Sequence, residues 1–185
     1  ISIIGAGSWG TALGLLLCNN GHDVTICSEN EKEIESLKEH REHLTKLPGV
    51  KLPDEMKFTC DVRGSLSGQD ILVMAKASVR TTCKKYAADI PDGQLIVNVA
   101  KGVEADTLMT MSQIIEEEVP GANVVVLSGP SHAEEVGRGL PTTIVVGAHD
   151  RESALYVQNV FMSPVFRVYT SPDITGIELG GALKN

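Results

Sequence analysis

The chain alternates between short apolar runs and longer stretches in which apolar residues recur at helical spacing. Three runs, at residues 71–75, 95–99 and 124–127, are apolar almost throughout, which is typical of strands buried on both faces of a parallel sheet. The full set of predicted strands is 1–4, 23–27, 57–60, 71–75, 95–99, 124–127, 142–147 and 166–170. Helical stretches lie between them, so the order of elements predicts a doubly wound α/β sheet in one domain.

The predicted helices cover residues 8–20, 30–41, 108–119, 151–161 and 172 to the end of the chain. The first is expected to stop at Gly21, because glycine is common just past a helix end. Asp106 stands where a cap for the third helix is expected. Residues 44–60 contain Pro48, Gly49 and Pro53, so they are expected to be irregular apart from the short strand at their end.

Composition leaves this picture intact and excludes several classes of protein. The chain has 185 residues, 42% of them apolar, which excludes general disorder. Its 16 basic and 24 acidic residues give a net charge of −8 without a basic cluster, which argues against nucleic-acid binding. No apolar run approaches the roughly 18 residues that can cross a bilayer. An aromatic content of 4% disfavours carbohydrate binding and base-stacking platforms.

The first residues and the cysteines bear on the cellular compartment. Residues 1–5 carry no basic region or cleavage site, so no signal peptide is expected. The absence of an initial Met indicates trimming within the first strand. The four cysteines, at positions 18, 27, 60 and 83, form no Cys-x-x-Cys pair, so no zinc or other metal site is expected. A reducing cytoplasm is the expected location.

The clearest chemical signal is GAGSWG at residues 5–10, a G-x-G-x-x-G pattern between a strand and an apolar helix. In a dinucleotide site Gly5 would make the tight turn, Gly7 would let a pyrophosphate approach the backbone, and Gly10 would let helix and strand pack closely. The helix N-terminus would face the phosphate charge. The pattern alone is common, but its place between strand and helix favours dinucleotide binding.

Glu29 follows the second predicted strand, at the distance from the glycines where a carboxylate can bind the ribose hydroxyls of adenosine. A carboxylate there would repel a 2′-phosphate, and no Arg lies within several residues. NAD is therefore favoured, with NADP left open. Lys32 is close enough in sequence to complicate this preference, although a solvated helix charge is the simpler interpretation.

Three further segments carry candidate chemistry. Lys101 follows the strand at 95–99, at the carboxyl edge where doubly wound sheets bind ligands. SGPSHA at 128–133 is a second glycine-serine turn at the same edge, leading into a short helix. Gly180 and Gly181 each weaken the last helix by about 1 kcal/mol relative to Ala, so close approach of a cofactor or another helix is expected there.

Together, these motifs resemble those of one enzyme family. They are GAGSWGTAL at 5–13, LPG at 47–49, KG at 101–102, SGPS at 128–131, LPT at 140–142 and GIELGGALKN at 176–185. They resemble the bacterial-type, soluble NAD(P)-dependent sn-glycerol-3-phosphate dehydrogenases. Sister reductases acting on 6-phosphogluconate-type and ketopantoate-type substrates share the glycine loop but not the last motif. The resemblance implies a Rossmann-type, mostly parallel sheet with extra strands after the first six.

The resemblance also implies an activity and roles for individual residues. The reaction would be reversible reduction of dihydroxyacetone phosphate to sn-glycerol 3-phosphate, which feeds phospholipid synthesis. To the cofactor contacts predicted from the glycine pattern, Gly5, Gly7, Gly10 and Glu29, the resemblance adds Ser8, Trp9, Lys101 and Ala133. Substrate contacts would come from Lys101, Gly129, Ser131, Lys184 and Asn185. Lys184 would exchange a proton with the substrate oxygen, and Lys101 would lower its pKa and stabilise the developing oxyanion.

Two positions depart from the family pattern. Residues 75–78 read Ala-Lys-Ala-Ser where the family usually has Ala-Val-Pro-Ser, and Lys76 is expected to add a cation near the nicotinamide side. Glu29 stands where the family often has a basic or neutral residue, so its cofactor preference can differ from that of relatives.

The family's chain continues beyond Lys184 into an all-helical substrate domain. Residues 1–183 are therefore expected to form the dinucleotide-binding domain, with 184–185 at the start of the second domain. The chain alone is expected to bind the dinucleotide with almost no turnover, and a homodimer is compatible with the whole enzyme. Two rivals remain open: another 2-hydroxy- or sugar-acid dehydrogenase of the superfamily, and a sensing domain that binds NAD without chemistry.

Overall fold

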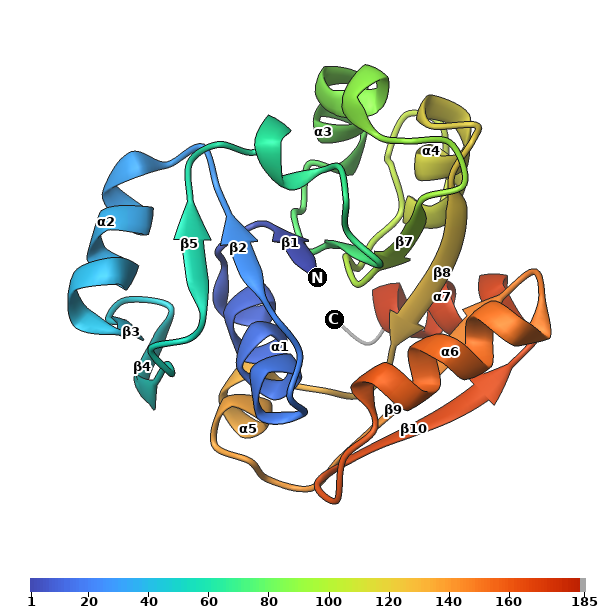
Figure 1. Cartoon of the computed structure of the whole chain (residues 1–185). Coiled ribbons are helices and arrows are strands. Elements are labelled where there is room, and N and C mark those ends of the chain that lie inside the picture. The colour runs from blue at the N-terminus through green and yellow to red at the C-terminus, as the bar shows by residue number, and fades with distance from the viewer. Residues whose placement is uncertain (184–185) are drawn as a thin grey trace.

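The chain folds around an eight-stranded sheet with helices on both faces (Figure 1). The structure, a computed structural model, describes residues 1–183. In sheet order the strands are β10 (Phe166–Ser171), β9 (Thr142–Ala148), β8 (Asn123–Ser128), β7 (Leu95–Asn98), β6 (Leu72–Met74), β1 (Ser2–Ile4), β2 (Thr25–Cys27) and β5 (Lys57–Thr59). The helices are α1 (Ser8–Asn19), α2 (Glu31–His40), α3 (Val79–Tyr86), α4 (Met111–Glu118), α5 (Ala133–Gly137), α6 (Arg151–Phe161) and α7 (Ile174–Leu183).

The sheet has the mostly parallel topology that the sequence predicts. The strands from β5 to β8 in sheet order run parallel to their neighbours, β9 is antiparallel to β8, and β10 is parallel to β9. β9 and β10 are thus the extra strands that follow the first six of this sheet. The path of the chain along the sheet reverses at β1, between β2 and β6, and doubly wound folds bind ligands at such a switch point.

Apolar residues on both faces of the central strands explain their near-continuous apolar runs. Ile3 of β1 and Val73 of β6 belong to a core built with α1 and α2, whereas Ile4 and Leu72 belong to a second core built with α3 and α4. Figure 1 shows α3 and α4 on the opposite side of the sheet from α1 and α5. Neither face of these strands is left to solvent, so no polar alternation is needed.

Most element boundaries lie within two residues of those predicted. α6 spans the predicted residues, and Gly21, with a φ of +89°, follows the C-cap of α1 as expected of a glycine past a helix end. β2 begins at Thr25 instead of residue 23. Among the described residues, no helix has both the length and the apolar character to cross a membrane.

The segment 44–60 is more regular than predicted. β3 (Glu42–His43) pairs antiparallel with β4 (Leu47–Lys51) in a small second sheet. Leu47 and Val50 are buried, and methyl groups of both lie 3.2–3.4 Å from where a Cβ on Gly137 of α5 would be. Burial against a distant helix, which local turn residues do not reveal, makes this segment a hairpin.

The predicted start of α4 is wrong. The helix begins at Met111, and its cap is Thr110 instead of Asp106. The backbone N–H of Thr110 donates to the side chain of Gln113 at 2.9 Å, while the Thr110 side chain accepts from the backbone of Gln113. Leu108 is 76% exposed with a φ of +59°, so it stands outside the helix. This Thr-x-x-Gln capping box sets the start of the helix, although apolar residues recur at helical spacing from Leu108 onward.

The capping box yields a stability prediction. Thr110→Ala should lower the free energy of unfolding by about 1 kcal/mol, because the backbone N–H of Gln113 in the first turn of α4 loses its acceptor. Asp106→Ala is the matched control and should change it by less than about 0.5 kcal/mol. Urea unfolding followed by circular dichroism measures both. Equal losses for the two variants would contradict this assignment of the cap.

Candidate functional site

Two adjoining clefts lie at the carboxyl edge of the parallel strands, around the glycine loop at residues 5–10. The Glu29 cleft, of about 370 Å³, is lined by residues at the ends of β1, β2 and β6. The Lys101 cleft, of about 320 Å³, is lined by residues that follow β6 and β7 and by the turn at 131–134. Ser8, Ala75 and Ala77 line both, so the two clefts meet beside the loop.

The three glycines of the loop differ in their surroundings. Gly5 has a φ of +117°, and a Cβ there would lie 3.2 Å from the backbone C and O of Ala75. A Cβ on Gly10 would lie 2.2 Å from the carbonyl oxygen of Gly5. The position of a Cβ on Gly7 has no atom within 4 Å. Two glycines therefore allow close packing, and Gly7 leaves open space.

The start of α1 has the charge that suits this open space. Gly7 is its N-cap and provides no side-chain cap, and the first turn contains no acidic residue. The first N–H groups of a helix have no partner within the helix, and the positive end of the helix dipole attracts an anion. The loop therefore fits a diphosphate group in both space and charge.

Two buried polar atoms in the Lys101 cleft also fit a bound ligand. Nε1 of Trp9 and Oγ of Ser131 are buried and have no hydrogen-bond partner within residues 1–183. Both residues line the cleft. Buried polar atoms normally have partners, so these two are suited to contact a dinucleotide or its substrate.

Lys101 lies close to the other residues predicted for this end of the site. Its Nζ donates to the carbonyl oxygens of Gly129, at 3.1 Å, and Ser131, at 3.5 Å, and lies 5.7 Å from the centroid of the Trp9 ring. Ala133 lines the same cleft. The structure thus brings together the predicted residues from three segments. Lys184 and Asn185 fall outside the described residues.

The glycine pair in α7 has a structural reason at one of its two positions. A Cβ on Gly181 would lie 2.3 Å from Oγ of Ser128 and 3.9 Å from Cγ of Lys101. Close approach of α7 to the end of β8 therefore requires Gly181, where the sequence predicted close approach of a cofactor or another helix. Gly180 is exposed with no atom within 4 Å of a Cβ, and nothing in the structure explains it.

A buried carboxylate that the sequence prediction missed connects α7 to the turn before Lys101. Glu178 is 5% exposed, and its Oε1 accepts from Nδ2 of Asn98 at 3.0 Å and from the backbone N–H of Ser112 at 2.9 Å. Oγ of Ser112 donates to Oε2 at 2.5 Å. Oδ1 of Asn98 in turn accepts from the N–H of Ala100 at 3.0 Å. The sequence held one signal for this carboxylate, because Glu178 is the only charged residue between positions 173 and 184.

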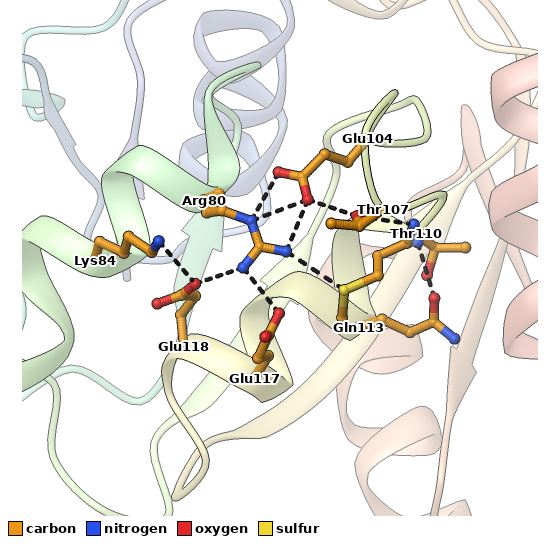
Figure 2. A network of polar contacts seen from close by, with 9 residues as sticks. Arg80, Lys84, Glu104, Thr107, Thr110, Gln113, Glu117 and Glu118 are labelled. Carbon is orange, nitrogen blue, oxygen red and sulfur yellow. Dashed lines mark hydrogen bonds and ion pairs between the residues drawn. The ribbon is translucent and has the colours of Figure 1, made fainter.

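A second network holds the loop after Lys101 through Glu104 (Figure 2). Arg80 of α3 donates to both carboxylate oxygens of Glu104, at 2.7–3.0 Å, and to Glu117 and Glu118 of α4, at 2.8 and 2.5 Å. Hydrogen bonds from Arg80 and then Thr107 lower the pKa of Glu104 to about 2. The network joins α3, this loop and α4.

Glu29 lies where a ribose carboxylate is predicted, but its surroundings differ from the expectation. Its carboxylate accepts hydrogen bonds from Lys85, at 2.6 Å, and from the hydroxyl of Tyr86. These two bonds, that of Lys85 first, lower the pKa of Glu29 to about 2. Lys32 lines a different hollow, so the cations beside Glu29 come from distant segments.

Lys76 is not where the sequence led us to expect it. Its Nζ lies 3.8 Å from Oε2 of Glu29, and it lines the Glu29 cleft instead of the Lys101 cleft. The turn after β6 directs this side chain toward the end of β2. The two positions that depart from the family pattern, Glu29 and the turn at residues 75–78, are therefore in contact.

Comparison with known proteins decides the family. A family model described as the N-terminus of NAD-dependent glycerol-3-phosphate dehydrogenase matches residues 1–154. The chain belongs to this family. The matched residues include the glycine loop, Lys101 and residues 129–133.

Curated relatives of this chain extend well beyond it. It is 59% identical over 187 residues to glycerol-3-phosphate dehydrogenase (NAD(P)+) of Agathobacter rectalis and 56% identical over 189 residues to that of Fusobacterium nucleatum. Each match covers 100% of this chain and 56% of the relative. The chain therefore spans about half the length of the curated relatives that it matches.

Solved structures agree with this assignment. The crystal structure of glycerol-3-phosphate dehydrogenase from Coxiella burnetii matches with a TM-score of 0.91 at 27% identity, over 97% of this chain and 56% of that one. A UDP-D-ManNAc dehydrogenase structure from Pyrococcus horikoshii matches at 0.75 with 14% identity, covering 97% of this chain and 49% of that one. The second likeness shows the fold alone.

The buried network around Glu178 can be tested by its contribution to stability. Glu178→Ala leaves the N–H of Ser112 and the amide of Asn98 without their acceptor, and each such buried donor costs about 1–3 kcal/mol. The free energy of unfolding in urea should therefore fall by at least about 2 kcal/mol. Glu39→Ala, at an exposed position of α2, is the control and should cost less than about 0.5 kcal/mol. Similar stability of both variants would contradict a structural role for Glu178.

Proposed function

We propose that the whole protein containing this chain transfers hydride reversibly between a nicotinamide dinucleotide and dihydroxyacetone phosphate or sn-glycerol 3-phosphate. Residues 1–183 would be its dinucleotide-binding domain, and an all-helical substrate domain would begin at 184. The observation that carries the proposal is the continuity of the two clefts, from Glu29 past the open space at Gly7 to Lys101.

The residues of the glycine loop would bind the dinucleotide. The first N–H groups of α1 would donate to the diphosphate beside Gly7, where no side chain intervenes. Glu29 would accept from the adenosine ribose hydroxyls, and Trp9 and Ala133 would border the nicotinamide in the Lys101 cleft. The bound cofactor supplies the hydride.

Lys101 would contribute positive charge at the reacting end. Two backbone carbonyls hold its ammonium group between the ends of β7 and β8, so its charge has a defined position in the cleft. An ammonium placed there favours both a substrate phosphate and negative charge on the carbonyl oxygen during reduction. Gly129 and Ser131 would complete this side of the substrate site, and Oγ of Ser131 supplies an unpaired hydroxyl.

The proton that accompanies hydride transfer would move through Lys184, with Asn185 beside it. A free lysine has a pKa of about 10.4, too high for a base at neutral pH. Burial by the second domain and the nearby charge of Lys101 would lower it, since both disfavour the ammonium form. Lys184 would then donate during reduction and accept during oxidation.

The cellular setting is a further part of the proposal. The product would supply glycerol 3-phosphate for phospholipid synthesis in the cytoplasm, and a homodimer is the proposed assembly of the whole enzyme. Four free cysteines within the described residues support a reducing compartment, because oxidising compartments favour disulfides.

The activity is tested by the oxidation of NADH with dihydroxyacetone phosphate, followed by absorbance in the whole protein. Turnover with the phosphorylated ketone and little with unphosphorylated dihydroxyacetone is the expected result, because Lys101 and the turn at 129–131 favour an anion. Equal rates with both ketones would favour another dehydrogenase of the superfamily. NADH binding without turnover of either would favour a sensing domain.

Lys101 can be tested separately. Lys101→Met should lower kcat/KM for dihydroxyacetone phosphate by about 100-fold or more, as loss of a group that stabilises an oxyanion does. Lys38→Met, at an exposed position of α2, removes the same charge far from the clefts and should leave kcat/KM unchanged. Full activity of Lys101→Met would remove Lys101 from the proposed chemistry.

A further inference from the structure

The Glu29 cleft gathers cations that the sequence around Glu29 does not show. Oε1 of Glu29 accepts from Nζ of Lys85 at 2.6 Å and from the hydroxyl of Tyr86, and Nζ of Lys76 lies 3.8 Å from Oε2. Glu29 follows β2, Lys76 follows β6, and Lys85 and Tyr86 end α3. Three segments therefore converge at the place proposed for the adenosine ribose.

We propose that these four residues together select the dinucleotide, with Glu29 occupying a cationic site that would otherwise hold a 2′-phosphate. The chain would therefore prefer NAD(H), and loss of this one carboxylate would turn the preference toward NADP(H). The inference rests on the dinucleotide binding proposed above and deepens it.

The balance of charge supports this arrangement. Two ammonium groups, those of Lys76 and Lys85, face the single carboxylate of Glu29. A 2′-phosphate carries a charge of about −1.5 to −2 at neutral pH, so beside Glu29 it would meet a carboxylate already paired with those cations. Without the carboxylate, the two lysines and the Tyr86 hydroxyl would all donate to phosphate oxygens.

The charged groups around Glu29 are accessible to a ligand, and the buried ring of Tyr86 packs against the core beside them. The side chains of Glu29, Lys76 and Lys85 are 39–52% exposed. The ring of Tyr86 is buried in the core beneath them and fixes the position of its hydroxyl.

The other charged residues that line the cleft leave this balance unchanged. Glu33 and Lys46 form an ion pair of their own, and Glu33 also contacts His43. The carboxylate of Glu33 is thus matched by a cation on the same side of the cleft. The two lysines beside Glu29 are the charges that a 2′-phosphate would meet first.

The structure and the local sequence predict different results for a neutral residue at position 29. With no cation nearby, removal of the carboxylate would weaken NADH binding and lift the repulsion of a 2′-phosphate, but it would leave no group to bind that phosphate. With Lys76 and Lys85 in place, the same change should create a phosphate site. The gain of NADPH affinity is therefore the measurement that distinguishes the prediction from the structure from the prediction from the local sequence.

Dissociation constants for NADH and NADPH, from the fluorescence enhancement of the bound dihydronicotinamide in the whole protein, test the inference. The unchanged protein should bind NADH more tightly than NADPH. Glu29→Gln should tighten NADPH binding by at least about tenfold and reverse the preference, because charge-assisted hydrogen bonds to phosphate replace those to the carboxylate. Glu29→Ser serves as a second variant if the glutamine disturbs folding.

Two further variants serve as controls. Adding Lys85→Met to Glu29→Gln should abolish most of the gain in NADPH affinity. Glu31→Gln removes the same charge two residues away, at the exposed start of α2, and should leave the NADH-to-NADPH ratio within about twofold.

The outcomes separate the inference from the function on which it rests. Glu29 variants that lose NADH affinity without gaining NADPH affinity would overturn the inference, as would a gain that does not depend on Lys85. Failure of the unchanged protein to bind either dinucleotide would overturn the proposed function instead.

Discussion

The close contact between the start of α1 and the ends of β1 and β6 is the constraint on which the site depends. Gly10 lies against the carbonyl of Gly5, and Gly5 lies against the backbone of Ala75. With side chains at these glycines, α1 would have to move away from the sheet, and its N-terminus would no longer face the open space at Gly7. Both clefts adjoin this contact, so it also sets their position relative to each other.

The two clefts use charge in physically different ways. Beside Glu29 the charged groups are half exposed, and such pairs weaken as salt screens them. The turn that leads to Lys101 is held through Asn98 and Glu178, whose hydrogen bonds are buried and so are little affected by salt. The Lys101 cleft is therefore held by buried hydrogen bonds, while the Glu29 cleft is bordered by exposed charges.

Local patterns predicted most of the fold and the half of the site that depends on the backbone. Apolar periodicity located the strands of the main sheet, and the glycine spacing located the loop, because both signals act between neighbours in sequence. The hairpin at β3 and β4 was missed because its apolar residues pack against α5, far along the chain. The partners of Glu29 and Glu178 were missed for the same reason, since side-chain contacts across segments leave no periodic signal. The capping box of α4 is also a local signal. The prediction followed the apolar spacing instead, which placed the start of the helix too early.

The net charge of −8 does not by itself determine where this domain can bind an anion. Charges separated by more than a Debye length, about 8 Å at physiological salt, are largely screened where they are exposed. A single anion therefore responds to the groups within reach, which are the helix N-terminus at Gly7 and the lysines around Glu29. An acidic chain can thus present two favourable positions for phosphate. One of them is already occupied by its own carboxylate, and that local pairing, more than the total charge, determines which anion the cleft accepts.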